Sequence, residues 1–222
     1  PNTDQSIKEV PSKIAGNIIK EDAIWSCTTC AACMEQCPVF IEHVNKIIDL
    51  RRYLILTEAK MPSPEASKTF ESMETNWNPW GMKFTQRANW ANQLDIRKIA
   101  EDQQVDYLLF VSCTGSFDDR NQKVINSLIK LLNQAGISFG ILGNDEACCG
   151  EPARKLGNEY VFQMMAKKNI EFFKKYNIKK IITHCPHCYN VLKREYPQFG
   201  GEFEVMHHTE LIARLLETGK IK

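Results

Sequence analysis

All nine cysteines of this 222-residue chain fall into two groups whose spacing suits iron-sulfur chemistry. We call them the N-terminal cysteine set (Cys27, Cys30, Cys33 and Cys37) and the C-terminal cysteine set (Cys113, Cys148, Cys149, Cys185 and Cys188). A thiolate is a soft ligand that binds both ferric and ferrous iron. Because no cysteine is left over, the simplest prediction is an electron carrier whose cysteines all bind iron.

The N-terminal set has the bacterial ferredoxin spacing Cys27-x2-Cys30-x2-Cys33-x3-Cys37-Pro38. Two intervening residues let the backbone turn around a cubane [4Fe-4S] cluster, so that the first three thiolates point inward. In two-cluster ferredoxins the cysteine before the proline binds the other cluster. If Cys37 does so here, the first three cysteines need a fourth ligand, which we expect in a motif before Pro1. The alternative, in which Cys37 closes its own cluster, stays open.

The C-terminal set does not suit a cubane. It supplies five thiolates, and two of them, Cys148 and Cys149, are adjacent in sequence. Adjacent cysteines cannot easily reach separate corners of one cube without strain. They can ligate neighbouring irons of a more open cluster, or one of them can bridge two irons. The spacing therefore predicts a cluster of another shape.

Four strand-helix alternations position these cysteines. The expected strands are 105–111, 137–142, 180–183 and 203–206, and the expected helices are 121–134, 159–176, 188–196 and 209–216. This order predicts an α/β protein with a parallel sheet. The C-terminal set follows the first three strands, and His207 with His208 follows the fourth. Because parallel strands end along one edge, we expect these side chains to meet there.

The segment before the sheet is expected to be helical. Apolar spacing predicts helices over 41–60 and 64–76, separated by the break Met61-Pro62-Ser63-Pro64. An aromatic-pinned turn follows at 77–81, and one short helix is expected near 86–93. Trp77, Trp80 and Trp90 are interpreted as packing residues rather than as an electron relay.

Composition excludes several classes of protein. With 28 basic and 27 acidic side chains, the chain lacks the basic surface that nucleic-acid binding requires. No apolar run reaches the roughly 18 residues of a membrane span, and the polar start lacks the apolar region of a signal peptide. An odd number of cysteines argues against a secreted disulfide framework. We therefore expect a protein of the cytoplasm or of the inner face of the membrane.

Two other interpretations concern the last cysteines. Cys185-Pro186-His187-Cys188 also has the form of a thioredoxin-like redox site, in which a helix dipole and a histidine lower the thiol pKa. Zinc could instead bind Cys148, Cys149, Cys185 and Cys188, because it accepts four thiolates. Both alternatives leave Cys113 without a role, and the first also lacks the antiparallel hairpin of a thioredoxin fold.

Four histidines lie near the C-terminal set in sequence. His184 and His187 are candidates for tuning the cluster or carrying a proton, since hydrogen bonds around a metal site set its properties. His207 and His208 are interpreted as loop or core residues.

The spacing of the C-terminal set, with Gly150 after the cysteine pair, resembles the cysteine-rich CCG domain of heterodisulfide reductase-like proteins. That resemblance implies a non-cubane [4Fe-4S] cluster bound by all five cysteines, in a parallel-sheet domain that a small helical ferredoxin-like module precedes. It sets the expected boundaries at 1–60 for the ferredoxin-like [4Fe-4S] module, truncated at its N-terminus, 61–104 for a linker or helical segment, and 105–222 for the CCG domain. Since 38–112 contain no cysteine, one non-cubane cluster at most is expected.

Several stretches sharpen this resemblance. They are 116–123, 148–154, 157–160, 184–188, 196–201 and 207–209. They are similar to the soluble part of membrane-bound oxidoreductases that pass electrons between electron-transfer flavoprotein and menaquinone. The resemblance implies an electron-transfer part of a larger oxidoreductase, with a flavoprotein as redox partner and a membrane domain or subunit outside this chain. The alternative is a heterodisulfide reductase-type catalytic subunit that reduces a disulfide at the non-cubane cluster.

Overall fold

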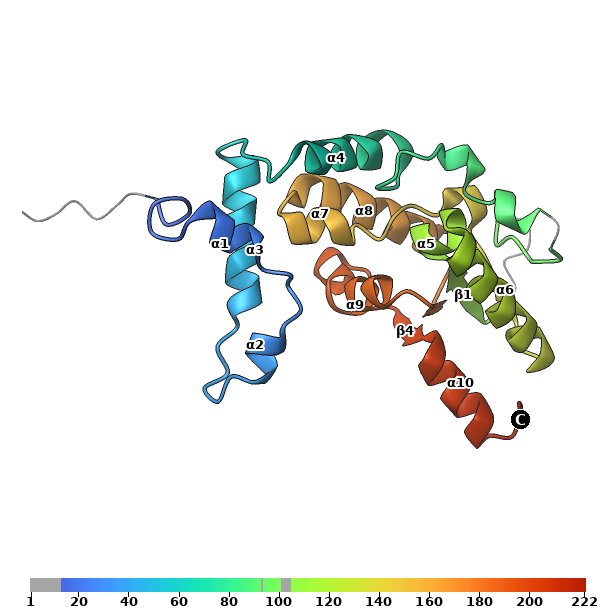
Figure 1. Cartoon of the computed structure of the whole chain (residues 1–222). Helices are drawn as coiled ribbons and strands as arrows, with labels where there is room; N and C mark the ends of the chain where they lie inside the picture. The colour runs from blue at the N-terminus through green and yellow to red at the C-terminus, as the bar shows by residue number, and fades with distance from the viewer. Residues whose placement is uncertain (1–12, 93, 101–104) are drawn as a thin grey trace, which may run out of the picture.

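A computed structural model of the chain describes residues 13–92, 94–100 and 105–222. Its helices are α1 (Glu21–Trp25), α2 (Ala32–Glu35), α3 (His43–Leu56), α4 (Pro64–Asn76), α5 (Ser112–Phe117), α6 (Asp119–Gln134), α7 (Glu151–Leu156), α8 (Glu159–Lys175), α9 (Pro186–Arg194) and α10 (His208–Glu217). Its strands are β1 (Tyr107–Phe110), β2 (Phe139–Gly140), β3 (Lys180–Thr183) and β4 (Glu204–His207). Short 3-10 turns η1 to η4 occupy Phe84–Gln86, Asn89–Ala91, Gly143–Asp145 and Tyr196–Phe199. Figure 1 shows this order along the chain.

The four strands form one parallel sheet in the order β2-β1-β3-β4, which confirms the predicted α/β fold. The chain passes from β1 to β2 on one side and then to β3 on the other. The ends of β1 and β3 therefore flank a topological switch point, where ligands of parallel sheets bind. β2 is shorter than the predicted strand 137–142, because Ile141 exchanges hydrogen bonds with Arg97 and Ile99 instead of continuing the β1 ladder.

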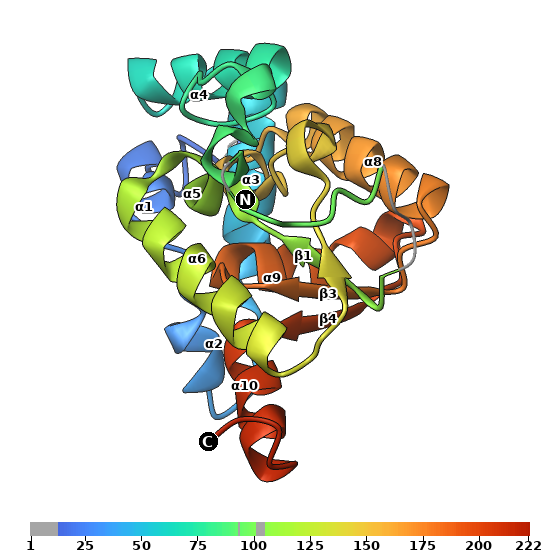
Figure 2. The same cartoon turned by 90° about the vertical axis from the view of Figure 1, so that its right-hand side faces the viewer.

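Successive strand residues face opposite sides of the sheet, and each side has its own core. One face carries Leu108, Phe110, Ile181 and Val205, which pack with α8 and α9. The other face carries Leu109, Ile182 and Met206, which pack with α6 and α10. Figure 2 shows α6 and α8 on opposite sides of the strands. The result is a three-layer domain whose strand ends meet at one edge.

The N-terminal residues form a small core of their own around Ala15, Ile24 and Leu54. Helix α4 belongs instead to the main core, through Phe70 and Met73. The prediction of a helix over 64–76 is confirmed, and Ser63 caps it by accepting the Ala66 N–H through its Oγ. The segment 61–104 is thus packed onto the sheet domain for much of its length.

Helix α3 lies beside α7, so that the N-terminal part contacts the sheet domain directly (Figure 1). Gly157 makes this approach possible. Its φ is +89°, and a Cβ there would lie 2.5 Å from the Arg52 backbone nitrogen. Arg52 also pairs with Glu159 at 2.9 Å across the same boundary. The two parts are therefore joined by close backbone packing and by an ion pair.

Two helices at the strand-end edge escaped the sequence analysis. Helices α5 and α7 have six residues each, too few to show a helical period, and they contain Gly115 and Pro152. The prediction of one helix near 86–93 is wrong. The chain there forms η1 and η2, and residue 93 lies outside the described residues.

Among the described helices, none combines the length and the apolar character that crossing a membrane demands.

Candidate functional site

The C-terminal cysteine set converges at the strand-end edge, as predicted. All five of its cysteines line one cavity of about 200 Å³, together with Pro79, Trp80, Ser112, Thr114, Glu151, Pro152 and His187. Four of the five are buried, and Cys185 is half-buried. The cysteines come from α5, from the loop before α7, and from the start of α9. Residues far apart in the sequence therefore share one site.

The five thiols lie close enough to shift one another's pKa values, in the order Cys113, Cys148, Cys149, Cys188, Cys185. Hydrogen bonds from Cys148 and Cys188 lower the pKa of Cys149 to about 6. A hydrogen bond from Cys188 likewise lowers the pKa of Cys185 to about 6. The pKa of Cys188 is raised, because it donates to both neighbours and is buried. The pKa values of Cys113 and Cys148 are raised as well.

This pattern tests whether an iron group fits the site. The pKa values of Cys149 and Cys185 are lowered, whereas hydrogen-bond donation and burial raise those of Cys113 and Cys188. A cationic group that replaces the thiol protons would balance all five thiolates, since metal binding requires deprotonated cysteine. Across the described ranges, no three or more His, Cys, Asp or Glu side chains form a preformed site for a single metal ion. Five thiols that line one cavity are nevertheless the kind of donor set that an iron-sulfur group uses.

The segment between the two cysteine sets supplies part of the cavity. Pro79 and Trp80 line it, and the Trp80 ring meets Phe117 of α5 edge to face, with centroids 6.4 Å apart. The Trp77 carbonyl accepts the Cys148 N–H at 2.9 Å. Trp90 packs on the α6 face of the sheet, in agreement with the packing role expected for it. The turn at 77–81 therefore covers the C-terminal set.

Two buried polar side chains hold the adjacent cysteines in place. Asn169 of α8 accepts the Ala147 N–H and donates to the Cys148 carbonyl, each at 3.0 Å. The Tyr196 hydroxyl donates to the Cys149 carbonyl at 3.2 Å. Gly150 follows with φ +91°, and a Cβ there would lie 2.7 Å from the Phe162 ring. Both the positive φ and the lack of space for a Cβ require a glycine after the two cysteines.

The turn before Cys113 is strained and is held by a buried ion pair. Ser112 has φ +67°, which costs a residue with a Cβ on the order of 1 to 2 kcal/mol. Glu146 accepts the N–H groups of Val111 and Ser112 at 2.9 and 2.8 Å. Arg87 donates to the same carboxylate at 2.7 Å, and its other terminal nitrogen lies 3.5 Å from Cys113 Sγ. Arg87 and Glu146 are both almost fully buried.

The N-terminal set lies in a loop that is more open. Cys30 and Cys33 are exposed, and Cys27 and Cys37 are half-buried. The Cys37 thiol accepts the Ile41 N–H, and this backbone contact is the main reason that its pKa is lowered. Thr29, Ala31 and Phe40 all have positive φ values, between 55° and 62°. These left-handed residues bend the chain around the positions that a cluster would occupy.

Buried Arg51 of α3 anchors this loop. Its guanidinium donates to the carbonyl oxygens of Ile24, Cys27 and Lys155. The loop around Cys27 is thereby tied to α7, which follows Cys149 in the sheet domain. One side chain thus holds the two cysteine sets in a fixed relation.

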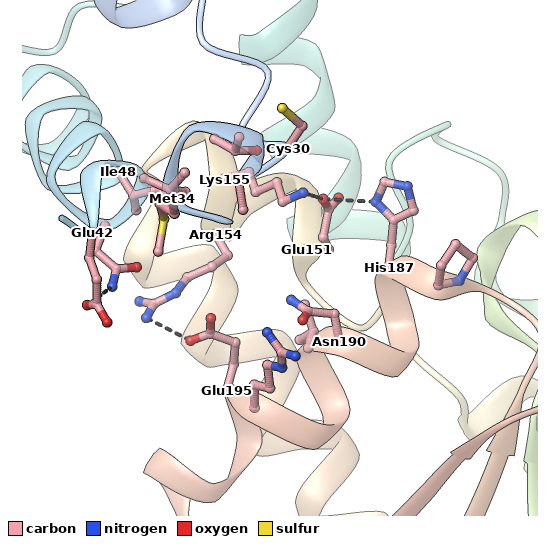
Figure 3. A pocket seen from close by; sticks show the side chains of 17 residues that line it. Cys30, Met34, Glu42, Ile48, Glu151, Arg154, Lys155, His187, Asn190 and Glu195 are labelled. Carbon is pink, nitrogen blue, oxygen red and sulfur yellow. Dashed lines mark hydrogen bonds and ion pairs between the residues drawn. The ribbon is translucent and has the colours of Figure 1, made fainter. Parts of the chain in front are cut away.

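A second, larger cavity of about 630 Å³ lies between this loop and helices α7 and α9. Cys30 borders it on one side, and Glu151 and His187 border both this cavity and that of the C-terminal set. Glu151 Oε1 lies 3.0 Å from His187 Nδ1 and 3.0 Å from Lys155 Nζ, as Figure 3 shows. Glu151 and His187 therefore form a wall shared by the cavity of the C-terminal set and the cavity that Cys30 borders.

The four histidines divide into two places. His187 lies in the shared wall and contacts Glu151, and its tuning role stays a prediction. His184, His207 and His208 gather at the ends of β3 and β4, with the rings of His207 and His208 4.4 Å apart. Burial lowers the pKa of His184 to about 4, and both of its ring nitrogens lack a partner in the part of the chain that the structure describes.

Sequence reasoning missed Arg87, Glu146, Asn169 and Tyr196. Arg87 lies in a stretch with no clear pattern, and nothing in the sequence ties it to Cys113. Asn169 carried a weak signal, since it is a polar residue on the apolar face of α8. Glu146 lies two residues before Cys148, and that closeness was the only hint of its role.

Comparison with known families assigns residues 107–193 to CCG, the cysteine-rich domain. No solved structure matches the chain. This range contains the whole C-terminal set together with β1, β2 and β3.

Curated relatives match the chain over almost its full length. It is 50% identical over 219 residues to the "Probable iron-sulfur-binding oxidoreductase FadF" of Bacillus subtilis, covering 96% of this chain and 31% of the relative. It is 44% identical over 223 residues to the "EtfAB:quinone oxidoreductase" of Syntrophomonas wolfei, covering 98% of this chain and 31% of that relative. One of the subunits of the dihydromethanophenazine:CoB--CoM heterodisulfide reductase of Methanosarcina mazei is 29% identical, over 96% of this chain and 52% of its own length. The chain thus spans about a third of the length of the first two relatives.

Proposed function

Because residues 107–193 belong to the CCG cysteine-rich domain family, we propose that this chain is the iron-sulfur electron-transfer part of a larger oxidoreductase. Electrons would pass through it from a flavoprotein toward a quinone. The observation that carries the proposal is the convergence of five thiols in one buried cavity, which shares a wall with the cavity beside Cys30. Metal groups bound by these two cysteine sets would suit a relay.

We assign a non-cubane [4Fe-4S] cluster to the C-terminal set and a cubane [4Fe-4S] cluster to the N-terminal set. Such clusters take up and release single electrons, at potentials that depend on net charge, hydrogen bonds to sulfur and exposure. The contrast between five thiols around one cavity, four of them buried, and four thiols in a more open loop supports two different clusters. The boundaries 1–60, 61–104 and 105–222 remain our proposal for the modules that hold them.

The residues around the C-terminal set hold its ligands in place. Asn169 and Tyr196 fix the carbonyls of Cys148 and Cys149, and Trp80 lines the cavity. Arg51 fixes the loop of the N-terminal set against α7. These contacts keep the two sets at a constant separation, which an electron relay requires.

The names of the relatives suggest the partners. One relative is named as a quinone oxidoreductase of EtfAB, and another is named "Probable membrane-anchored ferredoxin". We therefore propose that the chain works within a multi-subunit complex or a longer protein, with electron-transfer flavoprotein as the donor. The contact with quinone and the membrane would belong to parts of that assembly outside this chain.

A second candidate has its own observation. The cavity of about 630 Å³ beside His187 and Glu151 could admit a disulfide substrate next to the C-terminal set. The chain would then act as a heterodisulfide reductase-type catalytic subunit, as the name of the Methanosarcina relative suggests. Neither His207 nor His208 borders that cavity, so the histidine pair at β4 has no part in this candidate.

Stopped-flow reduction separates the two candidates. Reduced electron-transfer flavoprotein is expected to bleach the visible absorption of both clusters, because each would accept an electron. Small thiol disulfides are expected neither to restore that absorption quickly nor to change the spectrum of the C-terminal cluster.

Rapid and saturable oxidation by a disulfide, lost in Cys149→Ser, would replace the relay with the catalytic subunit. Clusters that respond to neither the flavoprotein nor the disulfides would contradict both candidates.

A further inference from the structure

We propose that the buried pair Arg87 and Glu146 sets the reduction potential of the cluster bound by the C-terminal set. Arg87 raises the potential and Glu146 lowers it. The inference rests on the proposed function, because it needs a redox-active cluster at Cys113. It assigns a role in electron transfer to two residues that bind no iron themselves.

The first step is the position of the positive charge. One terminal nitrogen of Arg87 lies 3.5 Å from the sulfur of Cys113, and the guanidinium carbon lies 5.8 Å from the centre of the Phe117 ring. The Arg87 side chain is 2% exposed, so water screens this charge weakly. An arginine also keeps its proton at any pH at which the protein functions. Arg87 is therefore a fixed positive charge beside a cluster ligand.

The second step is the compensating negative charge. Glu146 receives three donors, from Arg87 and from the backbone of Val111 and Ser112. These donors lie 2.7 to 2.9 Å from the carboxylate oxygens. Three donors on one carboxyl group favour its ionised form, because a protonated oxygen would lose an acceptor site. The site thus contains a positive charge that contacts the Cys113 sulfur and a negative charge that contacts the backbone before it.

The third step is the effect of these charges on reduction. Adding an electron makes the cluster more negative, so a nearby positive charge stabilises the reduced state and a nearby negative charge destabilises it. Hydrogen bonds to cluster sulfur act in the same direction as positive charge. Arg87 supplies both a charge and a hydrogen bond to Cys113, whereas Glu146 touches the backbone rather than the thiol. The two residues should therefore shift the potential in opposite directions.

A purely structural role for Arg87 and Glu146 predicts shifts of the potential in one direction only. If the pair only braced the strained Ser112 turn, removing either partner would loosen the same turn, and both changes would alter the cluster in the same direction. Opposite shifts cannot arise in that way. The sign of the shift is thus the readout that separates electrostatic tuning from bracing.

The experiment is a potentiometric titration of the anaerobically reconstituted full chain, followed by electron paramagnetic resonance of the C-terminal cluster. Arg87→Gln is expected to lower the ratio of reduced to oxidised cluster at least about tenfold at a fixed ambient potential. For a one-electron couple, tenfold corresponds to about 59 mV. Glu146→Gln is expected to raise the ratio, and the double variant should lie between the two single variants.

Two further variants complete the design. Arg87→Lys keeps the charge and should stay much closer to the wild-type potential than Arg87→Gln does. Arg52→Gln is the matched control, because it also removes an arginine that pairs with a carboxylate but lies at the boundary with α7. It should leave the potential of the C-terminal cluster unchanged.

Each outcome decides between explanations. Shifts of the same sign in Arg87→Gln and Glu146→Gln, or equal shifts in Arg87→Gln and Arg87→Lys, would overturn the inference while the proposed function stands. If Arg87→Gln fails to retain its cluster, the sign of the Glu146→Gln shift decides alone, and an unchanged or lowered potential overturns the inference. A wild-type protein without any cluster at the C-terminal set would overturn the proposed function as well.

Discussion

Cys149→Ser is expected to abolish the C-terminal cluster while the ferredoxin-type signal of the N-terminal set survives. Cys149 lies in the middle of the thiol chain, where it contacts both Cys148 and Cys188. A serine hydroxyl is a poor ligand for iron, so the loss of the Cys149 thiolate breaks the ligand set at its centre. Iron should fall by about four atoms per chain, the content of one [4Fe-4S] cluster. Iron analysis and electron paramagnetic resonance of the anaerobically purified variant give the measurement.

Two variants control this prediction. Cys113→Ser, at the end of the thiol chain, should damage the same cluster. Cys27→Ser, in the separate N-terminal loop, should remove the ferredoxin-type signal and spare the C-terminal one. If Cys149→Ser or Cys113→Ser removed both clusters from a protein that stays folded, the assignment of two independent ligand sets would be wrong.

Gly157→Ala is expected to destabilise the protein by about 3 kcal/mol, which for a chain of this size lowers Tm by about 6 to 12 °C. The new Cβ would lie 2.5 Å from the Arg52 nitrogen and 2.6 Å from the Arg51 carbonyl carbon, so the backbones of α3 and α7 must separate. Because Arg51 ties the N-terminal loop to α7, that separation should also slow electron passage between the clusters. Thermal unfolding and stopped-flow reduction measure the two effects.

Gly136→Ala is the matched control. Gly136 also has a positive φ, +68°, but a Cβ there would meet no atom within 4 Å. The substitution should therefore lower the free energy of unfolding only by the cost of placing alanine in the left-handed region, about 1 kcal/mol. Equal losses of stability in the two variants would show that the contact between α3 and α7 contributes nothing.

The sequence predicted the parts of this protein that depend on periodic patterns. Strand 180–183 and helix 64–76 were placed correctly, because β3 is a short run rich in β-branched residues and α4 combines helical periodicity with a proline at its first position. Parallel strands end at one edge, and that rule alone brought the five cysteines together. The short helices α5 and α7 gave no periodic signal, because six residues make less than two helical turns.

The polar support of the site could not be predicted in the same way. Arg87 reaches Cys113 across 26 positions of the chain, and Asn169 reaches Cys148 across 21. Such contacts depend on how η1 and α8 pack on the strand ends, and no local pattern encodes that packing. For the same reason, residues expected only to pin a turn, such as Trp80, proved to line the cavity of the C-terminal set.

Metal and sulfide analysis of the anaerobically purified protein tests the central claim most directly. If all nine cysteines serve iron-sulfur clusters, iron and acid-labile sulfide should approach four of each per intact cluster. Zinc should be absent at stoichiometric levels. Stoichiometric zinc without iron, persisting after anaerobic reconstitution with iron and sulfide, would contradict the account.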